Sequence, residues 1–388
     1  GLSAAMAAGY ESPQNTSLLA RWEATTNKVN NYFAVSGSYA NNAFTFIHPN
    51  GLQVQTLAHA RAKQIHAVNN LDIKWNARNT FSMYAWLTYI DRQIPATTFE
   101  ESSAKQEQIM NHRFLAQWTY QKSARNMNTT LGIFKEKYSY QDSFIHVESN
   151  IATFTVPWLW HTQWLVRKNH LFSTQVNAQA SWLQFNRDAH MQRLALQATY
   201  KVENIFSFLH CKASVQGELS NLFRPYVTSS VQLSNKRYKG GKAYMQMASS
   251  VRFPTLHEIY FNPGGNKNLL PEVGNNIEMG LNYATANARQ AFEIDAAFYS
   301  RQVDNWIVWF GSSIFTPHNI ARVWSRGNEC QLSYTLYVPK QTFTVKHFHT
   351  KAIQIGLLSA YTLSTTEESK VLNDYSIGKQ IPYVPRYQ

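Results

Sequence analysis

Residue types suited to catalysis or metal binding occur in this sequence, but their spacing matches no established active-site pattern. The stretch YKGGKAY (238–244) contains Gly-Gly-Lys, whereas a phosphate-binding loop needs the longer pattern GxxxxGK followed by Ser or Thr. His347 and His349 share one face of a predicted strand, yet no third metal ligand is spaced nearby. The patterns GxSxG and HExxH are missing as well. We therefore predict no catalytic residue, no metal site, no cofactor and no enzymatic activity.

Residues 249–283 suggest ligand binding instead, because a long connection rich in Pro, Gly, Asn and aromatic residues leads into an alternating strand. Side chains of this kind can stack on a ligand and hydrogen-bond to it. The alternative is that Pro, Gly and Asn only shape the loop, which is their commonest task. In that case Gly264 and Gly265 would supply the positive φ angles of a tight turn.

The composition favours a single folded β domain spanning residues 1–388. The chain is 44% hydrophobic, 14% aromatic and only 15% charged, which argues against disorder. No linker divides it, and strand-like alternation continues from end to end. Cys211 and Cys330 are far apart and lack CxxC spacing, so we predict two unpaired thiols.

Individual strands show one apolar and one polar face. In 277–283 the apolar face carries Ile277, Met279 and Leu281, while Glu278 and Asn282 lie on the other. In 291–299 the apolar face carries the set Phe292, Ile294, Ala296 and Phe298, opposite Glu293, Asp295 and Tyr299. No apolar run is long enough for a membrane helix, but a membrane strand needs only about 9–11 residues. A soluble β-sandwich produces the same alternation, so the strands alone leave both folds open.

The connections between predicted strands alternate in length. Short polar turns are expected at 25–31, 75–80, 121–126, 166–170, 201–205, 235–241, 284–290 and 338–343. Longer links are expected at 42–62, 92–106, 140–159, 252–273, 302–319 and 364–382, with shorter ones near 9–14, 184–188 and 217–224. Short turns on one edge and long loops on the other are typical of an outer-membrane β-barrel. We predict an all-β, antiparallel, up-and-down transmembrane barrel.

The segment VRFPTLHEIYFNPGGNKNLLPEVGNNIEMGLNY (251–283) resembles the pattern FRxPTLxELY…GNPxLxPExxxxYELGL of TonB-dependent outer-membrane receptors. The matching residues are Arg252, Pro254, Thr255, Leu256, Glu258, Tyr260, Gly265, Asn266, Asn268, Leu269, Pro271, Glu272, Glu278 and Gly280. Lys267 departs from it, because Pro is usual there. The stretches 297–309 and 317–329 resemble the next barrel hairpin, and YIDRQIP (89–95) resembles a loop entry of Bacteroidota members similar to cobalamin receptors.

The resemblance implies an active-transport receptor of the cell outer membrane. Such a receptor binds a scarce bulky nutrient, such as a ferric siderophore or cobalamin, at its extracellular loops and imports it with TonB-derived energy. The family's barrels have roughly 22 strands around a plug domain. Counting reversals gives about eighteen strands here, the last beginning at Tyr383. We therefore expect a partial barrel that lacks the N-terminal plug, through which TonB would be engaged, and the last strands.

The long loops of such a barrel share the extracellular rim, so 92–106, 252–273, 302–319 and 364–382 are the expected ligand-contacting loops. The residues predicted to bind the ligand, a small molecule or metal chelate, are Arg252, Tyr260, Asn266, Asn268 and Trp309. The net charge of +13 suits an anionic ligand or anionic outer-membrane lipid. Nucleic-acid binding is not expected, because the basic residues are scattered.

Two other classes of function stay open at this point. One is a passive porin or an outer-membrane enzyme on a similar barrel. The other is a soluble all-β module that binds glycans. A TonB box and a plug domain upstream of the barrel would distinguish the transport receptor from a porin or an enzyme.

Overall fold

A computed structural model describes residues 2–12, 15–47, 54–96, 100, 102–184, 189–205, 208–262, 264–310, 315–337, 352–369, 376–381 and 384–387. These residues form one antiparallel sheet of 17 strands, a small hairpin of β4 (Thr45–Ile47) and β5 (Val54–Thr56), and one short helix, α1 (Leu256–Tyr260). The strands of the large sheet are β1 (Leu2–Ser12), β2 (Asn15–Thr25), β3 (Val29–Ala40), β6 (Ala62–Lys74), β7 (Asn79–Ile94), β8 (Lys105–Lys122), β9 (Arg125–Asp142), β10 (Val147–Arg167), β11 (His170–Leu183), β12 (His190–Ile205), β13 (Leu209–Ser220), β14 (Tyr226–Asn235), β15 (Gly241–Arg252), β16 (Glu272–Ala286), β17 (Gln290–Phe310), β18 (Thr316–Tyr337) and β19 (Ala352–Ser369).

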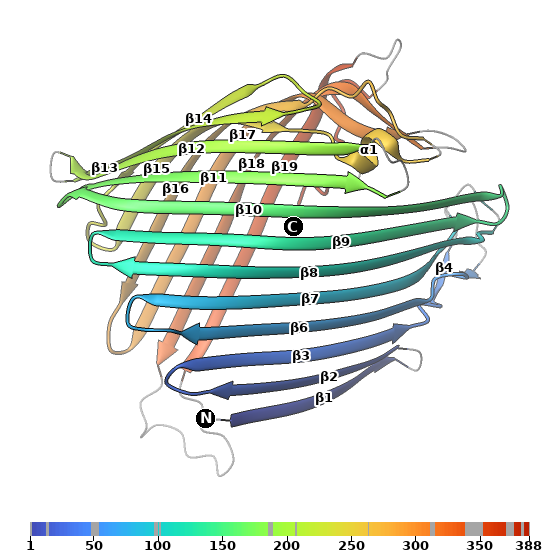
Figure 1. The fold of residues 1–388 in the computed structure, drawn as a ribbon, viewed down its shortest axis with the longest axis horizontal. Coiled ribbons are helices and arrows are strands. Elements are labelled where there is room, and N and C mark those ends of the chain that lie inside the picture. Colours follow the sequence, from blue (N-terminus) through green and yellow to red (C-terminus); the bar gives the residue numbers. More distant parts are fainter. Residues whose placement is uncertain are drawn as a thin grey trace.

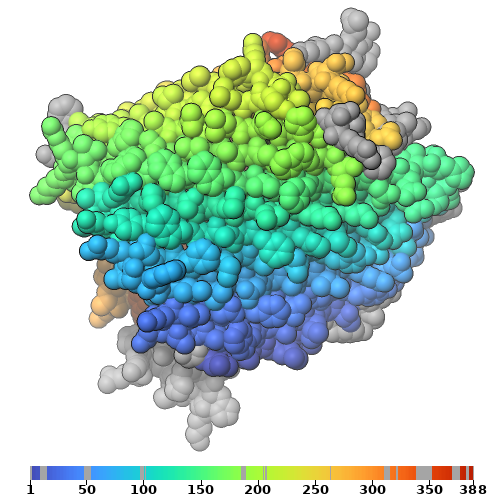
Figure 2. Space-filling view, in the orientation of Figure 1, coloured from blue at the N-terminus to red at the C-terminus, as the bar shows by residue number. Residues whose placement is uncertain are grey.

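The sheet is a curved up-and-down wall. Each strand is hydrogen-bonded to the next in chain order, from β1 with β2 to β18 with β19, and β3 pairs directly with β6. Figure 1 shows the sheet curling so that β15–β19 lie behind β6–β12, and Figure 2 shows the outer surface of the front wall. This architecture confirms the predicted antiparallel barrel. Among the described residues, no helix has the length and apolar character needed to span a bilayer.

The predicted outward face of β16 and β17 is confirmed. Ile277, Met279 and Leu281 are each more than 40% exposed, as expected of side chains that face lipid rather than a protein core. The pairing register places Phe298 opposite Met279 and Ile294 two positions along the same face. The apolar residues of the two strands therefore form one continuous stripe.

The opposite face of these strands carries polar contacts. Glu278 accepts a hydrogen bond from the Tyr244 hydroxyl at 2.7 Å, and Asn282 donates to Asp295 at 3.3 Å. Glu278 also lines a cavity of about 560 Å³ on this concave face. Charged side chains are tolerated here because a wet lumen solvates them, whereas lipid would not.

The two edges of the sheet differ as predicted, but two of the long links are shorter than expected. Residues 26–28, 75–78, 123–124, 168–169 and 287–289 form short turns on one edge, whereas 41–61, 95–104 and 253–271 are long connections on the other. The links predicted at 140–159 and 302–319 were wrong, because β9–β10 and β17–β18 continue as paired strands and leave only 143–146 and 311–315 between them. The parts of these strands that extend beyond the membrane do not face lipid, so their side chains need not alternate between apolar and polar. Their sequence therefore resembles that of a loop.

Pro157 lies inside β10, where a proline normally argues against a strand. The ladder between β10 and β9 has no paired residues at Val156 and Pro157, so the missing proline N–H breaks no bond there. On β9, a Cβ added to Gly132 would lie 2.8 Å from the Pro157 ring. Gly132 therefore leaves room for the proline ring, and β10 continues without a break on both sides of Pro157.

The final part of the chain is described in short pieces. The strand predicted at 344–363 is seen as β19 from Ala352, and residues 338–351, with His347 and His349, lie outside the described residues. Tyr383, where a further strand was predicted to begin, also lies outside them. Nearby, Tyr387 forms an antiparallel bridge with Tyr361 of β19, and the Thr362 N–H donates to the Arg386 carbonyl at 2.9 Å.

Candidate functional site

The candidate site is built around residues 253–271, which connect β15 to β16 on the long-loop edge and are here called the rim loop. Its only helix, α1, begins because Thr255 is an N-cap in a capping box with Glu258. The Thr255 hydroxyl accepts from the Glu258 N–H at 3.1 Å, and the Glu258 carboxylate accepts from the Thr255 N–H at 2.8 Å. The sequence Pro-Thr-Leu-His-Glu thus encodes a sharp helix start, which the sequence analysis did not predict.

Arg252 ties the two ends of the rim loop together. Its guanidinium donates to both carboxylate oxygens of Glu272 at 2.8 Å, and to both oxygens of Glu258 at 3.1 Å. Both carboxylates are largely shielded from solvent, with side-chain exposures of 12% for Glu258 and 13% for Glu272. Bidentate charge-assisted bonds of this kind fix geometry as well as adding stability. Arg252 therefore joins the last residue of β15, the helix and the first residue of β16.

Asparagine side chains fasten the rim loop to the neighbouring strands β17 and β18. Asn266 donates to the Pro317 carbonyl at 2.9 Å. Asn319 accepts from the Leu270 N–H at 2.7 Å and donates to the Leu270 carbonyl at 2.9 Å. Asn319 also donates to the Asn305 carbonyl at 2.7 Å. Asn319 thus satisfies both backbone polar groups of Leu270 in the rim loop.

The underside of α1 packs on a part of the wall that is distant in sequence. Leu256 and Ile259 are buried against Ile151, Leu183 and Met191, which belong to β10, β11 and β12. Fully burying a side chain of this size contributes about 1.5–3 kcal/mol. The rim loop therefore begins at the end of β15 and packs against β10, β11 and β12, which come much earlier in the chain.

A cluster of aromatic rings surrounds His257 of α1. The His257 ring lies 4.7 Å from Phe261, 5.4 Å from Tyr138 and 5.6 Å from Trp309, measured between ring centroids. Burial lowers the pKa of His257, and the nearby Glu258 carboxylate opposes this in part. The imidazole is therefore neutral at pH 7, which suits its position among aromatic rings.

The glycines of the rim loop have two different functions. Gly264 has a φ of +120°, which confirms the predicted positive φ. The same prediction for Gly265 was wrong, because Gly265 is not among the residues with positive φ. A Cβ on Gly265 would instead lie 2.5 Å from the Phe261 nitrogen and 2.7 Å from the Ile259 carbonyl oxygen. Gly265 is required by close backbone approach.

The five predicted ligand-binding residues all lie in or beside the rim loop, but they differ in what else they contact. Arg252 and Asn266 are engaged in the loop's own bonds. Asn268 is exposed, and its backbone N–H donates to the Asn266 side chain. Trp309 belongs to the ring cluster. Tyr260 lies under the Lys267 ammonium, at 5.6 Å, and lines a cavity.

The cavity beside Tyr260 has a volume of about 300 Å³ and lies between α1 and the upper end of β10. Ser149, Asn150 and Asn262 contribute polar groups to it, and Ile151 forms part of its apolar wall. The Ser149 hydroxyl is buried and has no hydrogen-bond partner among the described residues. Sequence analysis missed the β10 residues because they come from a segment expected to be a loop. No local pattern in the sequence indicates contacts over such a separation.

Comparison with known families decides the identity of this wall. The family model described as "TonB dependent receptor-like, beta-barrel" matches residues 7–388. The chain belongs to the TonB-dependent receptor family. It is accordingly a β-barrel of the outer membrane, with the rim loop on the side of the long connections.

Solved structures share the fold at low sequence identity. The siderophore receptor PirA from Pseudomonas aeruginosa matches with a TM-score of 0.68 and 11% identity, over 95% of this chain and 67% of that chain. The copper transporter OprC matches with a TM-score of 0.68 and 10% identity, over 94% and 61% of the two chains. The FrpB iron transporter from Neisseria meningitidis matches with a TM-score of 0.69 and 8% identity, over 94% and 62%.

The chain thus spans 61% to 67% of the length of these three proteins. A search of curated proteins finds no match to the sequence. The similarity to solved structures establishes the fold of the barrel.

Proposed function

We propose that the protein containing this barrel is an active-transport receptor that captures a scarce bulky nutrient at its rim and imports it with energy from the TonB complex. The observation that carries the proposal is the braced rim loop. Arg252, Asn266 and Asn319 hold the loop at both ends and at its side, so its exposed residues form a preorganised surface. Several similar structures are named as siderophore, iron or copper proteins, which favours a metal chelate as the ligand class. A cobalamin-like ligand fits the resemblance at 89–95.

Growth and uptake assays test this proposal. A strain that lacks the full-length gene should fail to grow when a ferric siderophore or a corrinoid is the only source of iron or cobalamin. The complemented strain should recover, and a strain without TonB should behave like the deletion. Uptake that continues without TonB would identify a passive porin instead.

We further propose that Tyr260, Asn268 and Trp309 contact the ligand directly, whereas Arg252 and Asn266 act through the shape of the rim loop. Tyr260 borders the 300 Å³ cavity, where the Ser149 hydroxyl has no partner within the described part of the chain and can bond to a ligand hydroxyl or carbonyl. Tyr260→Ala, Asn268→Ala and Trp309→Ala should weaken ligand uptake while the amount of receptor in the outer membrane stays unchanged. The exposed turn residue Lys236, on the opposite edge, provides the control variant Lys236→Ala. Unchanged uptake in all three variants would contradict the assignment.

A further inference from the structure

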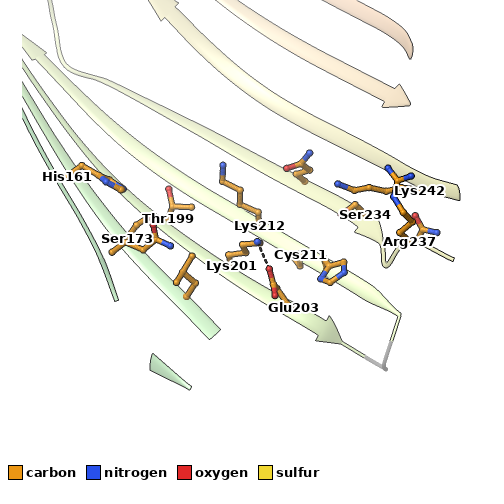
Figure 3. A pocket seen from close by; sticks show the side chains of 15 residues that line it. His161, Ser173, Thr199, Lys201, Glu203, Cys211, Lys212, Ser234, Arg237 and Lys242 are labelled. Atoms are coloured by element: carbon orange, nitrogen blue, oxygen red, sulfur yellow. Dashed lines mark hydrogen bonds and ion pairs between the residues drawn. The ribbon is translucent and has the colours of Figure 1, made fainter. Parts of the chain in front are cut away.

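The outward face of β8–β12 carries a row of basic and aromatic side chains at the short-turn edge, on the left of Figure 1. Ser173 and Thr199 line a cavity of about 640 Å³ on the inner face of these strands (Figure 3). Phe172 and Tyr200 are their neighbours in sequence, so they face the other way. Tyr200 shares this outward face with Leu196, which is 51% exposed. The row therefore lies on the lipid side of the wall.

The pairing register defines the row across five strands. Lys122 of β8 pairs with Arg125 of β9, and Arg125 pairs with Trp164 of β10. Trp164 pairs with Phe172 of β11, which in turn pairs with Tyr200 of β12. Side chains of directly paired residues lie on the same face of a sheet, so these five side chains are successive neighbours on the outside of the barrel.

No other part of a barrel covers this face. Each strand from β8 to β12 is hydrogen-bonded to a described strand on both sides, so no further strand joins the sheet at this point. A plug domain lies inside a barrel and contacts the other side of the strands. The surroundings of the row are therefore lipid chains and lipid headgroups.

The aromatic side chains mark the level of the membrane interface. Trp164 stacks on Phe172, with 5.7 Å between the ring centroids. Trp118 and Tyr120 lie on the same face of β8 as Lys122, with ring centroids 6.5 Å apart. Trp and Tyr rings gather where the hydrocarbon region meets the headgroups. The basic residues that follow at the strand ends are therefore at the level of the phosphates.

Three basic residues lie at that level on the outward face. Lys122 and Arg125 are direct partners, and Arg167 pairs with His170, which shares the face of Phe172. All three basic side chains are exposed. Like charges that lie directly opposite each other in a sheet are destabilising. An anion between them would relieve this repulsion.

The protein itself supplies no counter-charge for these residues. None of the ion pairs among the described residues includes Lys122, Arg125 or Arg167. At the long-loop edge, by contrast, Arg92 is paired with Glu107, and Arg252 is held by two carboxylates. The unpaired arginines and lysine of the short-turn edge therefore favour an anion from outside the protein.

The position of Arg125 leaves its hydrogen-bond donors accessible to such an anion. The central guanidinium carbon is 5.9 Å from the centroid of the Trp164 ring. A guanidinium that lies over a ring uses its face, whereas its N–H groups point outward in its own plane. One of them reaches only the Met127 sulfur, at 4.0 Å. Guanidinium groups bind phosphate through strong, directional hydrogen bonds.

We propose that this row binds the headgroup of an anionic phospholipid in the periplasmic leaflet of the outer membrane. The phosphate accepts hydrogen bonds from Arg125 and Arg167, and the Lys122 ammonium adds to the positive field. The acyl chains lie along Trp164 and Phe172. The site is on the lipid face, so its occupation does not depend on the transport function proposed above.

Native mass spectrometry of the full-length receptor in a neutral detergent tests the proposal. Phosphatidylglycerol and phosphatidylcholine with the same acyl chains are titrated separately, and the dissociation constant of the first bound lipid is measured. Phosphatidylglycerol should bind about tenfold more tightly. Arg125→Gln with Arg167→Gln should weaken its binding by about tenfold or more, because each basic residue near an anionic headgroup contributes about fivefold. Binding of phosphatidylcholine should stay unchanged.

The matched control is Arg78→Gln with Arg289→Gln. It removes two exposed arginines from short turns of the same edge that lie outside the row, so the charge of the protein changes equally. This variant should bind phosphatidylglycerol as the native protein does. Heat-modifiable migration in electrophoresis checks that each variant is folded, and the single variant Arg167→Gln is used if the double variant is not.

Four results would overturn the proposal. The first is equal affinity of the native receptor for the two lipids. The second is equal affinity of the two double variants for phosphatidylglycerol. The third is binding of glycerol 3-phosphate as tight as that of phosphatidylglycerol, which would indicate a site for a free phosphate. The fourth is a carbodiimide cross-link in intact cells from Lys122 to a carboxylate of another polypeptide, which would assign the row to an acidic protein partner.

Discussion

Arg252 shows how one residue can match a binding motif and still have a structural function. All three of its guanidinium nitrogens donate to Glu258 or Glu272, so the group is already engaged within the protein. The sequence alone offered ligand binding and loop shaping as alternatives for this loop. The contacts favour loop shaping for Arg252 and Asn266, while the role of the exposed side chains in binding stays a prediction.

Replacement of Arg252 should therefore loosen the rim loop before it affects any ligand. Arg252→Ala leaves two shielded carboxylates without a counter-charge, and like charges at close range repel. Hydrogen exchange of residues 253–271 should become faster, and the additional changes Glu258→Gln and Glu272→Gln should restore part of the protection. Arg252→Lys should give an intermediate result, since an ammonium cannot bind two carboxylates in bidentate geometry. Native exchange rates in Arg252→Ala would refute the bracing role.

His257 should make the rim loop sensitive to pH. Its pKa is lowered in the folded loop, mainly by burial, whereas in an opened loop it returns to about 6.5. Above that value the ring is neutral in both states and imposes no cost. As the pH falls below about 6.5, the opened loop takes up the proton first, so the folded loop loses stability until the pH passes its own lower pKa.

The measurement is hydrogen-exchange protection of residues 253–271 between about pH 7.5 and about pH 5.5, corrected for intrinsic rates. Protection should decrease toward the acidic end in the native protein. In His257→Phe, which keeps a ring in the cluster but removes the titrating group, the dependence should flatten. Identical pH profiles for the two proteins would show that His257 does not control the loop.

The strands were the most predictable elements, because lipid imposes a strict alternation on the part of the wall that crosses the membrane. Each of the 17 strands of the large sheet overlaps a segment that the turns and alternation predicted as strand, although β10, β17 and β18 run on into the links predicted at 140–159 and 302–319. The failures lie outside the membrane. There, β9–β10 and β17–β18 extend with mixed polar sequence, and Pro157 is tolerated because Gly132 gives it space. Helix α1 was missed because a helix of 5 residues has no periodicity to recognise.

The facing of β17 gives the sharpest test at the level of an element. Ile294 is on the apolar face and Asp295 on the lumen face. Ile294→Arg should destabilise the folded barrel by about 2–4 kcal/mol if the position is near the bilayer midplane. Asp295→Arg should be accommodated by the wet interior. Unfolding titrations in lipid vesicles measure both, and a silent Ile294→Arg with a damaging Asp295→Arg would mean that the strand faces the other way.

At the scale of the whole molecule, the sequence predicted the wall and its two edges but not which distant parts meet. The rim loop's contacts with β10–β12 depend on how the sheet curls. Curvature results from the summed twist of many strands, and no short pattern encodes it. The docking of the rim loop is therefore a product of the curled sheet more than of any motif.

The docking of α1 on β10–β12 also has a mechanical consequence. The rim loop is attached to the sheet between β15 and β16 and contacts it again at β10–β12, so it bridges the two strands between them, β13 and β14. A loop of fixed length that is attached at both ends fixes the curvature of the strands between its attachment points. The sheet from β10 to β15 can therefore change its curvature only if Leu256 and Ile259 lose their contacts with β10–β12. A force applied to α1 from outside is consequently transmitted to β10, β11 and β12, which come before β13 and β14 in the chain. The long-loop edge of the barrel is therefore stiffened between β10 and β16. Any increase in the diameter of this edge has to come from the other strands.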